Sequence, residues 1–147
     1  MSVAEIIIHP NEILRAVCDP VETFDEELGQ IIQTMRATMT AANGIGLAGP
    51  QIGITRRIAL VGKFSMINPR IVWHSQAESI LEEGCLSIPN SRMKVLRPSS
   101  VEVEYFDLLG NKKKVKLNEK MAKCAQHEID HLNGILILDK ALMEEAA

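Results

Sequence analysis

The sequence predicts an α+β fold in which mixed or antiparallel β-sheets pack around one central helix, with another helix near the N-terminus. Only two segments show helical periodicity, and the segments with strand character cluster around them instead of alternating with helices. The chain has 147 residues, of which 46% are hydrophobic, and this suits one unit with a sizeable core. We therefore expect residues 1–147 to form a single domain.

The first helix is expected over residues 25–42. Its apolar residues recur every three or four positions and so form one stripe, which consists of Leu28, Ile31, Ile32, Met35 and Met39. Thr23 or Asp25 can cap its start, and Asn43–Gly44 should end it.

Strands are expected where short apolar or alternating runs lie between turn residues. The expected strands are residues 58–61, 67–73, 81–88, 101–108 and 114–117, and residues 135–138 form a further short apolar run. In segment 101–108 apolar residues alternate with glutamates, and Gly110–Asn111 turns the chain back, which predicts a hairpin.

The second helix is expected over residues 118–133, with Asn118 as its N-cap and Gly134 after its last turn. Its packing residues lie on both sides of the helix and are Met121, Ala122, Ala125, Ile129 and Leu132. A helix that packs on both sides is buried, so its polar side chains need partners.

This second helix carries the motif HExxH. His127 and His131 lie four residues apart and hence on one face, where a single cation can reach both imidazoles. Glu128 lies beside that pair, where it can serve a water molecule on the metal. The alternative is a pair of surface or core histidines without a metal.

A catalytic metal site of this type needs a third protein ligand and one open position. No histidine follows the second helix, and Cys124 lies seven residues before His131, about 10.5 Å along the helix axis. Cys124 is therefore better interpreted as a buried wall residue. Cys85 is the better candidate, because Gly84 before it permits close approach of another element. The alternative is that Cys85 is an ordinary core residue.

The glycine-rich segment 44–51 contains the letters GxGxxG, which suggest a dinucleotide site. That site requires a strand before the motif and a helix after it, whereas here a helix precedes and Pro50 follows. We therefore reject nucleotide binding. The better interpretation is a backbone segment that passes close to a ligand, with the amide of Gln51 directed into the site. The alternative is an ordinary loop in which Gln51 faces solvent.

Composition restricts the location and the partners of the protein. A net charge of −3 gives no reason to expect DNA binding, and no apolar stretch approaches the roughly 18 residues of a membrane span. Three cysteines without a CxxC pair predict a reducing compartment. We expect a cytoplasmic protein, bacterial or phage-encoded in a bacterial host, and less readily an organellar one. The run Lys112–Lys114 is expected to be a solvated hairpin end, with contact to an anionic partner such as a ribosome as the alternative.

Three segments, in this order, resemble the peptide deformylases, a family with the motifs GxGLAAxQ, EGCLS and QHExDH. The chain has GIGLAGPQ at residues 44–51, EGCLS at 83–87 and QHEIDH at 126–131, and its segment from Ile8 to Arg15 is also similar to the start of that family. The resemblance covers about residues 8–140. Each motif alone is modest, but the ordered set of three is very specific.

The resemblance implies one catalytic domain over the whole chain and a role for each matching residue. The residues expected to hold the metal or to act in catalysis are Cys85, His127 and His131 as ligands, Glu128 as general acid/base, and Gln51 and the Leu86 N–H as oxyanion donors. The residues expected to bind substrate are Ile45, Gly46, Leu81, Glu83, Gly84, Arg92 and Cys124. Of these, Leu81, Cys124 and the Ile45 loop would line an apolar pocket for a methionine side chain.

The same resemblance implies a reaction. One divalent metal ion per chain, natively Fe(II) and in isolated protein also Zn, Ni or Co, would activate water to remove the formyl group from nascent N-formylmethionyl peptides and release formate. We expect the enzyme to be a monomer. Two other functions remain open: a structural or sensory metal-binding domain with a closed shell of four ligands, and a metallopeptidase that cleaves internal bonds.

The chain departs from the family pattern in two places. Gly49 stands where the family has a second alanine, and we expect this glycine to loosen the loop. The chain ends at Ala147, so we expect the C-terminal helix of many bacterial members to be absent or reduced to a stub, as in a short form from a phage or a divergent lineage. This departure puts docking to a ribosome through that helix in doubt, but not the chemistry.

Overall fold

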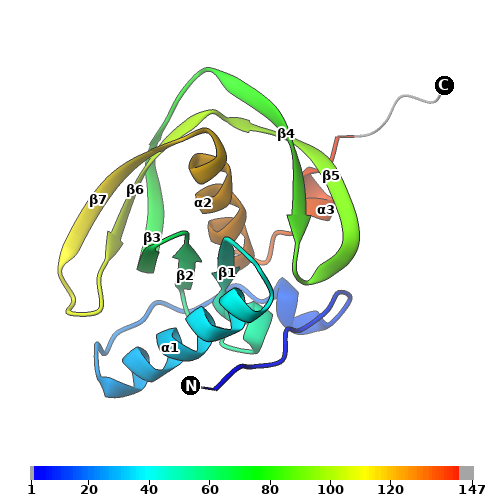
Figure 1. Cartoon of the computed structure of the whole chain (residues 1–147). Helices are drawn as coiled ribbons and strands as arrows, with labels where there is room; N and C mark the ends of the chain where they lie inside the picture. Colours follow the sequence, from blue (N-terminus) through cyan, green and yellow to red (C-terminus); the bar gives the residue numbers. More distant parts are fainter. Residues whose placement is uncertain (1, 143–147) are drawn as a thin grey trace.

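The computed structural model of the chain describes residues 2–142, and their strands form two sheets (Figure 1). One sheet has five strands in the order β1-β2-β3-β6-β7, and β4 pairs with β5 in a separate two-stranded ribbon. The strands are β1 (Gly46–Ala48), β2 (Ile58–Val61), β3 (Phe64–His74), β4 (Glu78–Cys85), β5 (Ile88–Pro98), β6 (Ser100–Phe106) and β7 (Lys112–Asn118). All these pairings are antiparallel, so the antiparallel alternative of the predicted α+β fold is the one observed.

The central element is a helix between the two sheets. The helices are α1 (Glu26–Ala41), α2 (Glu119–Leu132) and α3 (Ile137–Lys140), with 3₁₀ turns η1 (Glu12–Arg15) and η2 (Gly49–Ile52). Figure 1 shows α2 between the five-stranded sheet and the β4–β5 ribbon, with α1 below β1 and β2. The predicted arrangement of sheets around a central helix is confirmed. The C-terminal stub expected near Ala147 lies outside the described residues.

α1 begins and ends within one residue of the predicted bounds. Asp25 accepts a hydrogen bond from the Leu28 N–H at 3.0 Å, so Asp25 and not Thr23 caps the helix. The predicted apolar stripe is buried against one face of the five-stranded sheet, where it meets Ile58 and Leu60 of β2. This packing explains why segment 58–61 has no polar residue: both faces of β2 are covered, one by α1 and the other by α2.

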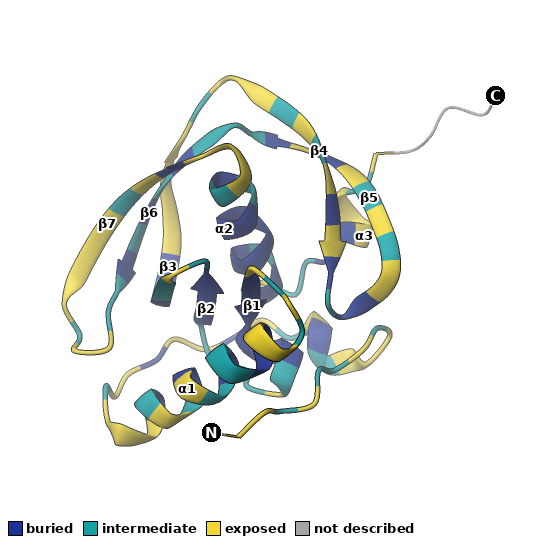
Figure 2. Cartoon of the chain, in the orientation of Figure 1, coloured by how far each residue is buried: buried dark blue, intermediate teal, exposed yellow. Residues whose placement is uncertain are grey.

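α2 is buried along most of its length, as its two-sided packing predicts (Figure 2). Its apolar side packs on the inner face of β6, where Val101, Val103 and Tyr105 alternate with outward-facing glutamates. The predicted N-cap Asn118 precedes the first turn, but its side chain accepts a hydrogen bond from Ser100 Oγ and makes none to the helix. Packing of its apolar residues, and not a side-chain cap, therefore holds α2 in place. Its other face is directed at the ribbon.

Three predictions about strands were wrong or incomplete. Neither β1 nor β5 was predicted as a strand. Most side chains of β5 are exposed or half-buried, so its sequence has little apolar periodicity, and only pairing with β4 makes it a strand. The expected strand 81–88 is not continuous. β4 ends at Cys85, a turn follows, and β5 begins at Ile88. The apolar run at residues 135–138 leads into the short helix α3.

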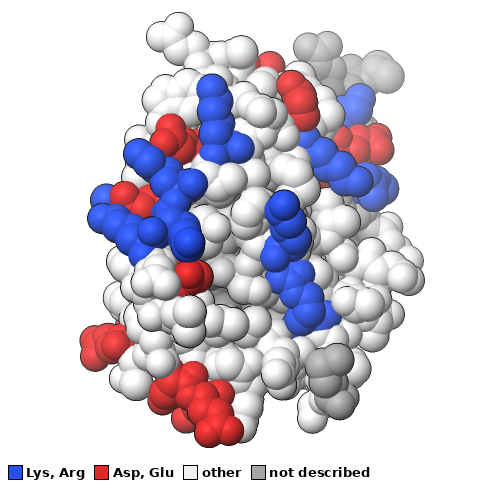
Figure 3. All heavy atoms as spheres, turned by 60° about the vertical axis from the view of Figure 1, so that its left-hand side comes forward, with Lys and Arg blue, Asp and Glu red and all other residues white. Residues whose placement is uncertain are grey.

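The lysines of the β6–β7 hairpin are partly neutralised across the strands. Lys112 Nζ lies 3.4 Å from Glu104 and Lys114 Nζ lies 3.2 Å from Glu102, so the solvated-hairpin interpretation accounts for them. Figure 3 shows basic side chains over the upper and middle parts of one face of the molecule, with acidic ones among them and a further acidic group at the lower left. Within residues 2–142 no helix combines the length and the apolar character that crossing a membrane would need.

Candidate metal centre

Three potential metal ligands from two distant segments meet where the ribbon approaches α2. Cys85 ends β4, and His127 and His131 project from successive turns of α2. One ligand atom from each of these side chains lies within 4.8 Å of the other two, and Cys85 Sγ lies 3.4 Å from His131 Nε2. Donor atoms around a tetrahedral ion with bonds of about 2.0–2.3 Å would lie roughly 3.3–3.8 Å apart. The three residues therefore have the spacing that one ion requires after small adjustments.

The hydrogen bonds around these residues also fit a metal ion. His127 Nδ1 lies 3.1 Å from Glu83 Oε1, which fixes the ring and leaves Nε2 as the ligand atom. Two buried side-chain atoms, Glu128 Oε1 and His131 Nδ1, have no partner among the described residues. Unpaired polar atoms in the interior are costly, and a cation with its water molecule would supply an interaction for the carboxylate. A thiolate with two imidazoles is a donor set suited to Fe(II) or Zn.

The charge state of the two histidines follows from their surroundings. Burial lowers the pKa of His131 to about 3, helped by His127 and Arg97, so this imidazole is neutral and free to bind a metal. Burial also lowers the pKa of His127, but the negative charge of Glu128 and the hydrogen bonds to Cys85 and Glu83 outweigh it and raise the value to about 10. The same negative charge favours a metal cation, which would displace that proton on binding.

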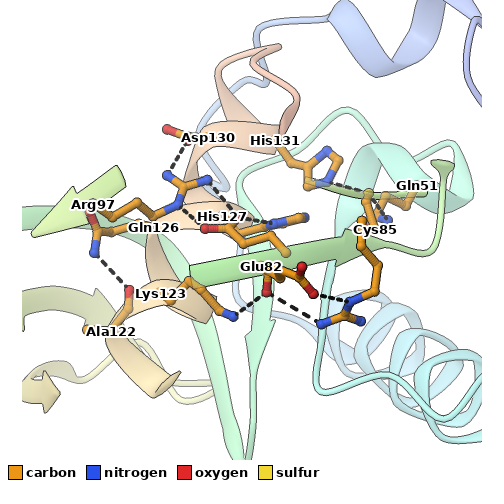
Figure 4. Close-up of polar contacts among 12 residues, drawn as sticks. Gln51, Glu82, Cys85, Arg97, Ala122, Lys123, Gln126, His127, Asp130 and His131 are labelled. Atoms are coloured by element: carbon orange, nitrogen blue, oxygen red, sulfur yellow. Dashed lines mark hydrogen bonds and ion pairs between the residues drawn. The ribbon is translucent and has the colours of Figure 1, made fainter. Parts of the chain in front are cut away.

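A buried ion-pair network supports His127 from the ribbon (Figure 4). Arg97 of β5 donates to both carboxylate oxygens of Glu83, from Nε at 2.6 Å and from Nη2 at 3.0 Å, and its Nη1 lies 2.8 Å from Asp130 of α2. Burial raises the pKa of Glu83, but His127 and Arg97 outweigh this and hold it below its usual value, so the carboxylate stays ionised. Glu83 was predicted to bind substrate; it lies on the cleft wall, and its carboxylate is taken up by Arg97 and His127.

Arg97 and Ser87 were missed in the sequence. Glu83 lies at a buried strand position and needs a basic partner, and this is the signal that points to an arginine. Choosing Arg97 and not Arg92 requires the register of β4 against β5, and β5 was not predicted. Ser87 gives no sequence signal beyond its place in the EGCLS segment.

Glu128 follows His127 on α2, lines the same cleft as Cys85 and His127, and is 5% exposed. Burial raises its pKa to about 7, against the lowering effect of His127. A carboxyl group with this pKa can accept and return a proton near neutral pH. The carboxylate lies against β1, where a Cβ added to Gly46 would overlap Glu128 Oε2 and lie 2.8 Å from Cys124 Sγ. Only glycine lets the strand approach α2 so closely.

Gln51 directs its amide toward the same centre. Its Oε1 accepts the Ala48 N–H at 2.9 Å, and its Nε2 donates to Ser87 Oγ at 3.1 Å and lies 3.8 Å from Cys85 Sγ. The side chain is 2% exposed, so the alternative of a solvent-facing glutamine is wrong. Leu86 follows Cys85 in the turn between β4 and β5 and lies on the wall of the same cleft.

The loop that carries Gln51 is tight. Gly49 is buried, and its carbonyl accepts the Ile54 N–H at 2.9 Å. A Cβ added to Gly49 would lie 2.5 Å from the Ile54 carbonyl oxygen and 2.9 Å from that of Arg56. The expectation that Gly49 loosens this loop is therefore wrong, because here the glycine permits a closer approach of two backbone segments.

A cleft of about 640 Å³ opens beside the centre. The predicted site residues on its wall are Ile45, Gly46, Gln51, Glu83, Gly84, Cys85, Leu86, Arg92, Cys124, His127 and Glu128. Cys124 is buried, its Sγ lies 3.7 Å from the Ile45 carbonyl, and burial raises the pKa of its thiol, so it is a neutral wall residue as predicted. His131 lies deeper.

Leu81 is not on this wall, which corrects its assignment to the methionine pocket. It lines a separate small cavity between β4, β5 and the start of α2. Leu81 and Cys85 lie on the same face of β4, but Glu83 stands between them and its pair with Arg97 separates the two spaces. Strand alternation predicts the face correctly but does not show what divides it.

Comparison with known proteins decides what kind of centre this is. A family model described as polypeptide deformylase matches residues 3–146. The chain belongs to the peptide deformylase family. It is 41% identical over 148 residues to the peptide deformylase of Rhizobium meliloti, and 43% identical over 148 residues to that of Brucella suis. In both comparisons the match covers 95% of this chain and 85% of the relative.

Solved structures of peptide deformylases have the same fold. The Thermotoga maritima enzyme superposes with a TM-score of 0.94 at 35% identity, covering 97% of this chain and 100% of the other. A class I type b peptide deformylase from Acinetobacter baumannii, crystallised with Met-Ala-Ser bound, gives 0.91 at 33% identity, covering 95% and 99%. Members of this family are enzymes that remove N-formyl groups from nascent peptides in a metal-dependent reaction.

Proposed function

We propose that this chain removes the formyl group from the N-terminal formylmethionine of nascent peptides and releases formate, with residues 1–147 acting as one catalytic domain. The observation that carries the proposal is the meeting of Cys85 with His127 and His131 beside a buried carboxylate and a buried amide. The relative crystallised with Met-Ala-Ser supports the substrate class, because this peptide is what remains when formate leaves formyl-Met-Ala-Ser.

In this proposal Cys85, His127 and His131 hold one divalent ion, natively Fe(II), with Zn, Ni or Co able to take its place. When bound, the ion supplies a Lewis acid and a nucleophile made from water near neutral pH. The remaining chemistry belongs to the protein. Glu83 and Arg97 keep the His127 ring in place through the hydrogen bond to Nδ1, so that the site is ordered before the ion binds.

Glu128 acts as the general base and then as the general acid. Its raised pKa lets it take the proton from the attacking water and return it to the amine that leaves with methionine. Because Gly46 brings β1 against the carboxylate, Glu128 is confined to the space beside the ligands. This confinement holds the proton acceptor next to the point of attack.

Gln51 and the Leu86 N–H stabilise the negative charge that develops on the formyl oxygen. The Gln51 amide is oriented by Ala48 on its oxygen side, so its nitrogen faces the centre. A preorganised donor of this kind typically contributes about 2.7–4 kcal/mol to the transition state. Ile45, Gly46 and Gly84 would contact the peptide backbone, and Cys124 with the Ile45 loop would contact the methionine side chain.

The test of this proposal is release of formate from formyl-Met-Ala-Ser by protein purified without oxygen, with metal measured on the same sample. We expect turnover in proportion to bound metal and none with unformylated peptides. Cleavage of internal bonds would support a metallopeptidase instead. A bound metal without turnover, with four protein ligands, would support a structural or sensory domain.

We also propose where the enzyme works. Its curated relatives are bacterial, and its three described cysteines are free, which suits the bacterial cytoplasm. Nascent peptides emerge at the ribosome, so a transient contact with the ribosome surface would bring substrate to the cleft. We expect a monomer in solution, which light scattering would test.

A further inference from the structure

The mouth of the cleft is more basic than the rest of the protein. Arg92, Lys120 and Lys123 lie on its wall, whereas the chain as a whole has a net charge of −3. The carboxylates on that wall are Glu82, Glu83 and Glu128. Two of these are buried and already have roles at the metal centre, so Glu82 alone faces the three basic side chains.

The contacts of Glu82 leave most of this positive charge uncompensated. Its carboxylate lies 3.6 Å from Arg92 Nε, and both side chains of that pair are more than half exposed, so the pair is weak. Lys123 Nζ donates to the backbone carbonyl of Glu82 at 3.0 Å and not to the carboxylate (Figure 4). Lys120 makes no ion pair with any described residue. The mouth therefore holds an excess of positive charge.

The two lysines share a helix face with the metal ligand. Lys120, Lys123 and His127 lie on successive turns of the cleft-facing side of α2. From Lys120 to His127 the helix rises about 10.5 Å, and an extended peptide covers that distance with about three residues. A peptide whose formyl group lies at the metal centre would thus bring the residues after its methionine within reach of the lysines.

We infer that Lys120 and Lys123, with Arg92 opposite them, make the enzyme select formylated peptides that carry an acidic side chain at one of the three positions after methionine. The inference rests on the proposed function and names its preferred substrates. Aliphatic parts of the lysines can still line the cleft while their ammonium groups meet a carboxylate at the mouth. Attraction at this distance from the formyl group lowers KM and leaves kcat nearly unchanged, because it acts equally on substrate and transition state.

The experiment compares matched amidated peptides, so that the only variable charge is a side chain. Formyl-Met-Glu-Ser-Ser, formyl-Met-Ala-Glu-Ser and formyl-Met-Ala-Ser-Glu are each measured against the same peptide with Gln or Lys in place of Glu. We expect at least one Glu peptide to exceed its Gln match in kcat/KM by about 2- to 5-fold per lysine engaged, and its Lys match to fall below. The difference should shrink as salt rises from 0.05 to about 0.5 M.

Variants separate the two lysines from general charge. In the double variant Lys120→Gln with Lys123→Gln the preference should disappear, and Lys120→Glu with Lys123→Glu should reverse it toward the Lys peptides. Lys113→Gln, an exposed lysine on β7 outside the cleft, is the matched control and should keep the wild-type preference.

The outcomes distinguish the inference from the proposed function. Equal kcat/KM for Glu, Gln and Lys peptides at every position, with good turnover of all, overturns only the preference. A preference that persists in the double Gln variant also overturns the assignment, because the selection then arises elsewhere. If the wild-type protein releases formate from none of the peptides, the proposed function itself fails.

Discussion

The two sheets of this molecule do different work, although both are antiparallel and both pack on α2. The five-stranded sheet is apolar where it meets the helices, and its two faces pack against the apolar residues of α1 and of α2. The inner side of the β4–β5 ribbon carries Glu83, Cys85 and Arg97, each directed at a polar group on α2 or at the metal centre. The five-stranded sheet stabilises α2 through apolar contacts, and the ribbon contributes the polar contacts that form the metal centre.

This contrast shows how a small fold keeps a reactive centre without losing stability. Buried charge costs free energy unless it is paired and hydrogen-bonded. The ribbon supplies those pairs locally, while the rest of the core contributes the hydrophobic stabilisation. Changes in the ribbon should therefore alter chemistry and metal binding, and changes in the apolar core of the five-stranded sheet, away from β1, should alter stability alone.

The largest effect is expected at the acid/base. Glu128→Gln keeps the volume of the side chain but removes its ability to take a proton, so kcat should fall by about 10²–10⁴-fold. Metal content and melting temperature should stay close to wild type, because Glu128 is not one of the three clustered ligands. Retained turnover at more than a tenth of the wild-type rate would show that another group is the base.

The next effect compares two arginines. Arg97→Ala leaves Glu83 buried without its cation, which should cost about 3–5 kcal/mol of unfolding free energy. The same variant should weaken metal binding by about 10- to 100-fold through His127. Arg70→Ala is the control, because Arg70 pairs with Glu104 on the exposed face of the five-stranded sheet and should cost at most about 1 kcal/mol. Denaturant unfolding measures the loss of stability, and metal titration measures the loss of affinity. Equal losses in Arg97→Ala and Arg70→Ala would contradict the proposed difference between the ribbon and the five-stranded sheet.

A smaller effect is expected at the amide. Gln51→Leu removes the donor that faces the centre, and kcat should fall by about 10²–10³-fold, or about 2.7–4 kcal/mol in the transition state. KM and metal content should change little if the amide acts on developing charge. A variant with wild-type kcat and a raised KM would show instead that Gln51 binds the ground-state substrate.

The smallest effect is expected in the five-stranded sheet. Ile67→Val in β3 removes one buried methyl group from the core around α1, so unfolding should become easier by about 0.5–1.5 kcal/mol. Formate release per folded molecule and metal affinity should be unchanged. A loss of metal binding in this variant would mean that the sheet and the ribbon are coupled through α2.

Much of this contrast could be predicted from the sequence, and the rest depends on pairing between distant strands. The apolar stripe of α1 and the alternation in β6 follow from periodicity, and both were predicted with nearly correct bounds. Cys85 was the better candidate for a third ligand beside the HExxH histidines on the residues alone, and the family resemblance implied the same set. The pairing of Glu83 with Arg97 was missed because Arg97 lies on β5, a strand whose sequence has almost no periodic signal.

Other differences arise from close contacts that a single sequence does not encode. Leu81 lies on the predicted face of β4, but the Glu83–Arg97 pair divides that face and places Leu81 in another cavity. Gly49 differs from the family pattern, and its effect depends on the carbonyl groups of Ile54 and Arg56, which approach it from across the loop. In both cases the deciding neighbour comes from a contact that local patterns do not specify.

The central claim is that Cys85 of the ribbon and the two histidines of α2 bind the same ion. X-ray absorption at the metal edge tests it most directly, on the wild-type protein and on Cys85→Ala loaded with the same metal. We predict one sulfur neighbour at about 2.3 Å and two imidazole nitrogens at about 2.0–2.1 Å in the wild type, with the sulfur lost in the variant. A wild-type spectrum without sulfur, or a sulfur signal that persists in Cys85→Ala, would contradict the account.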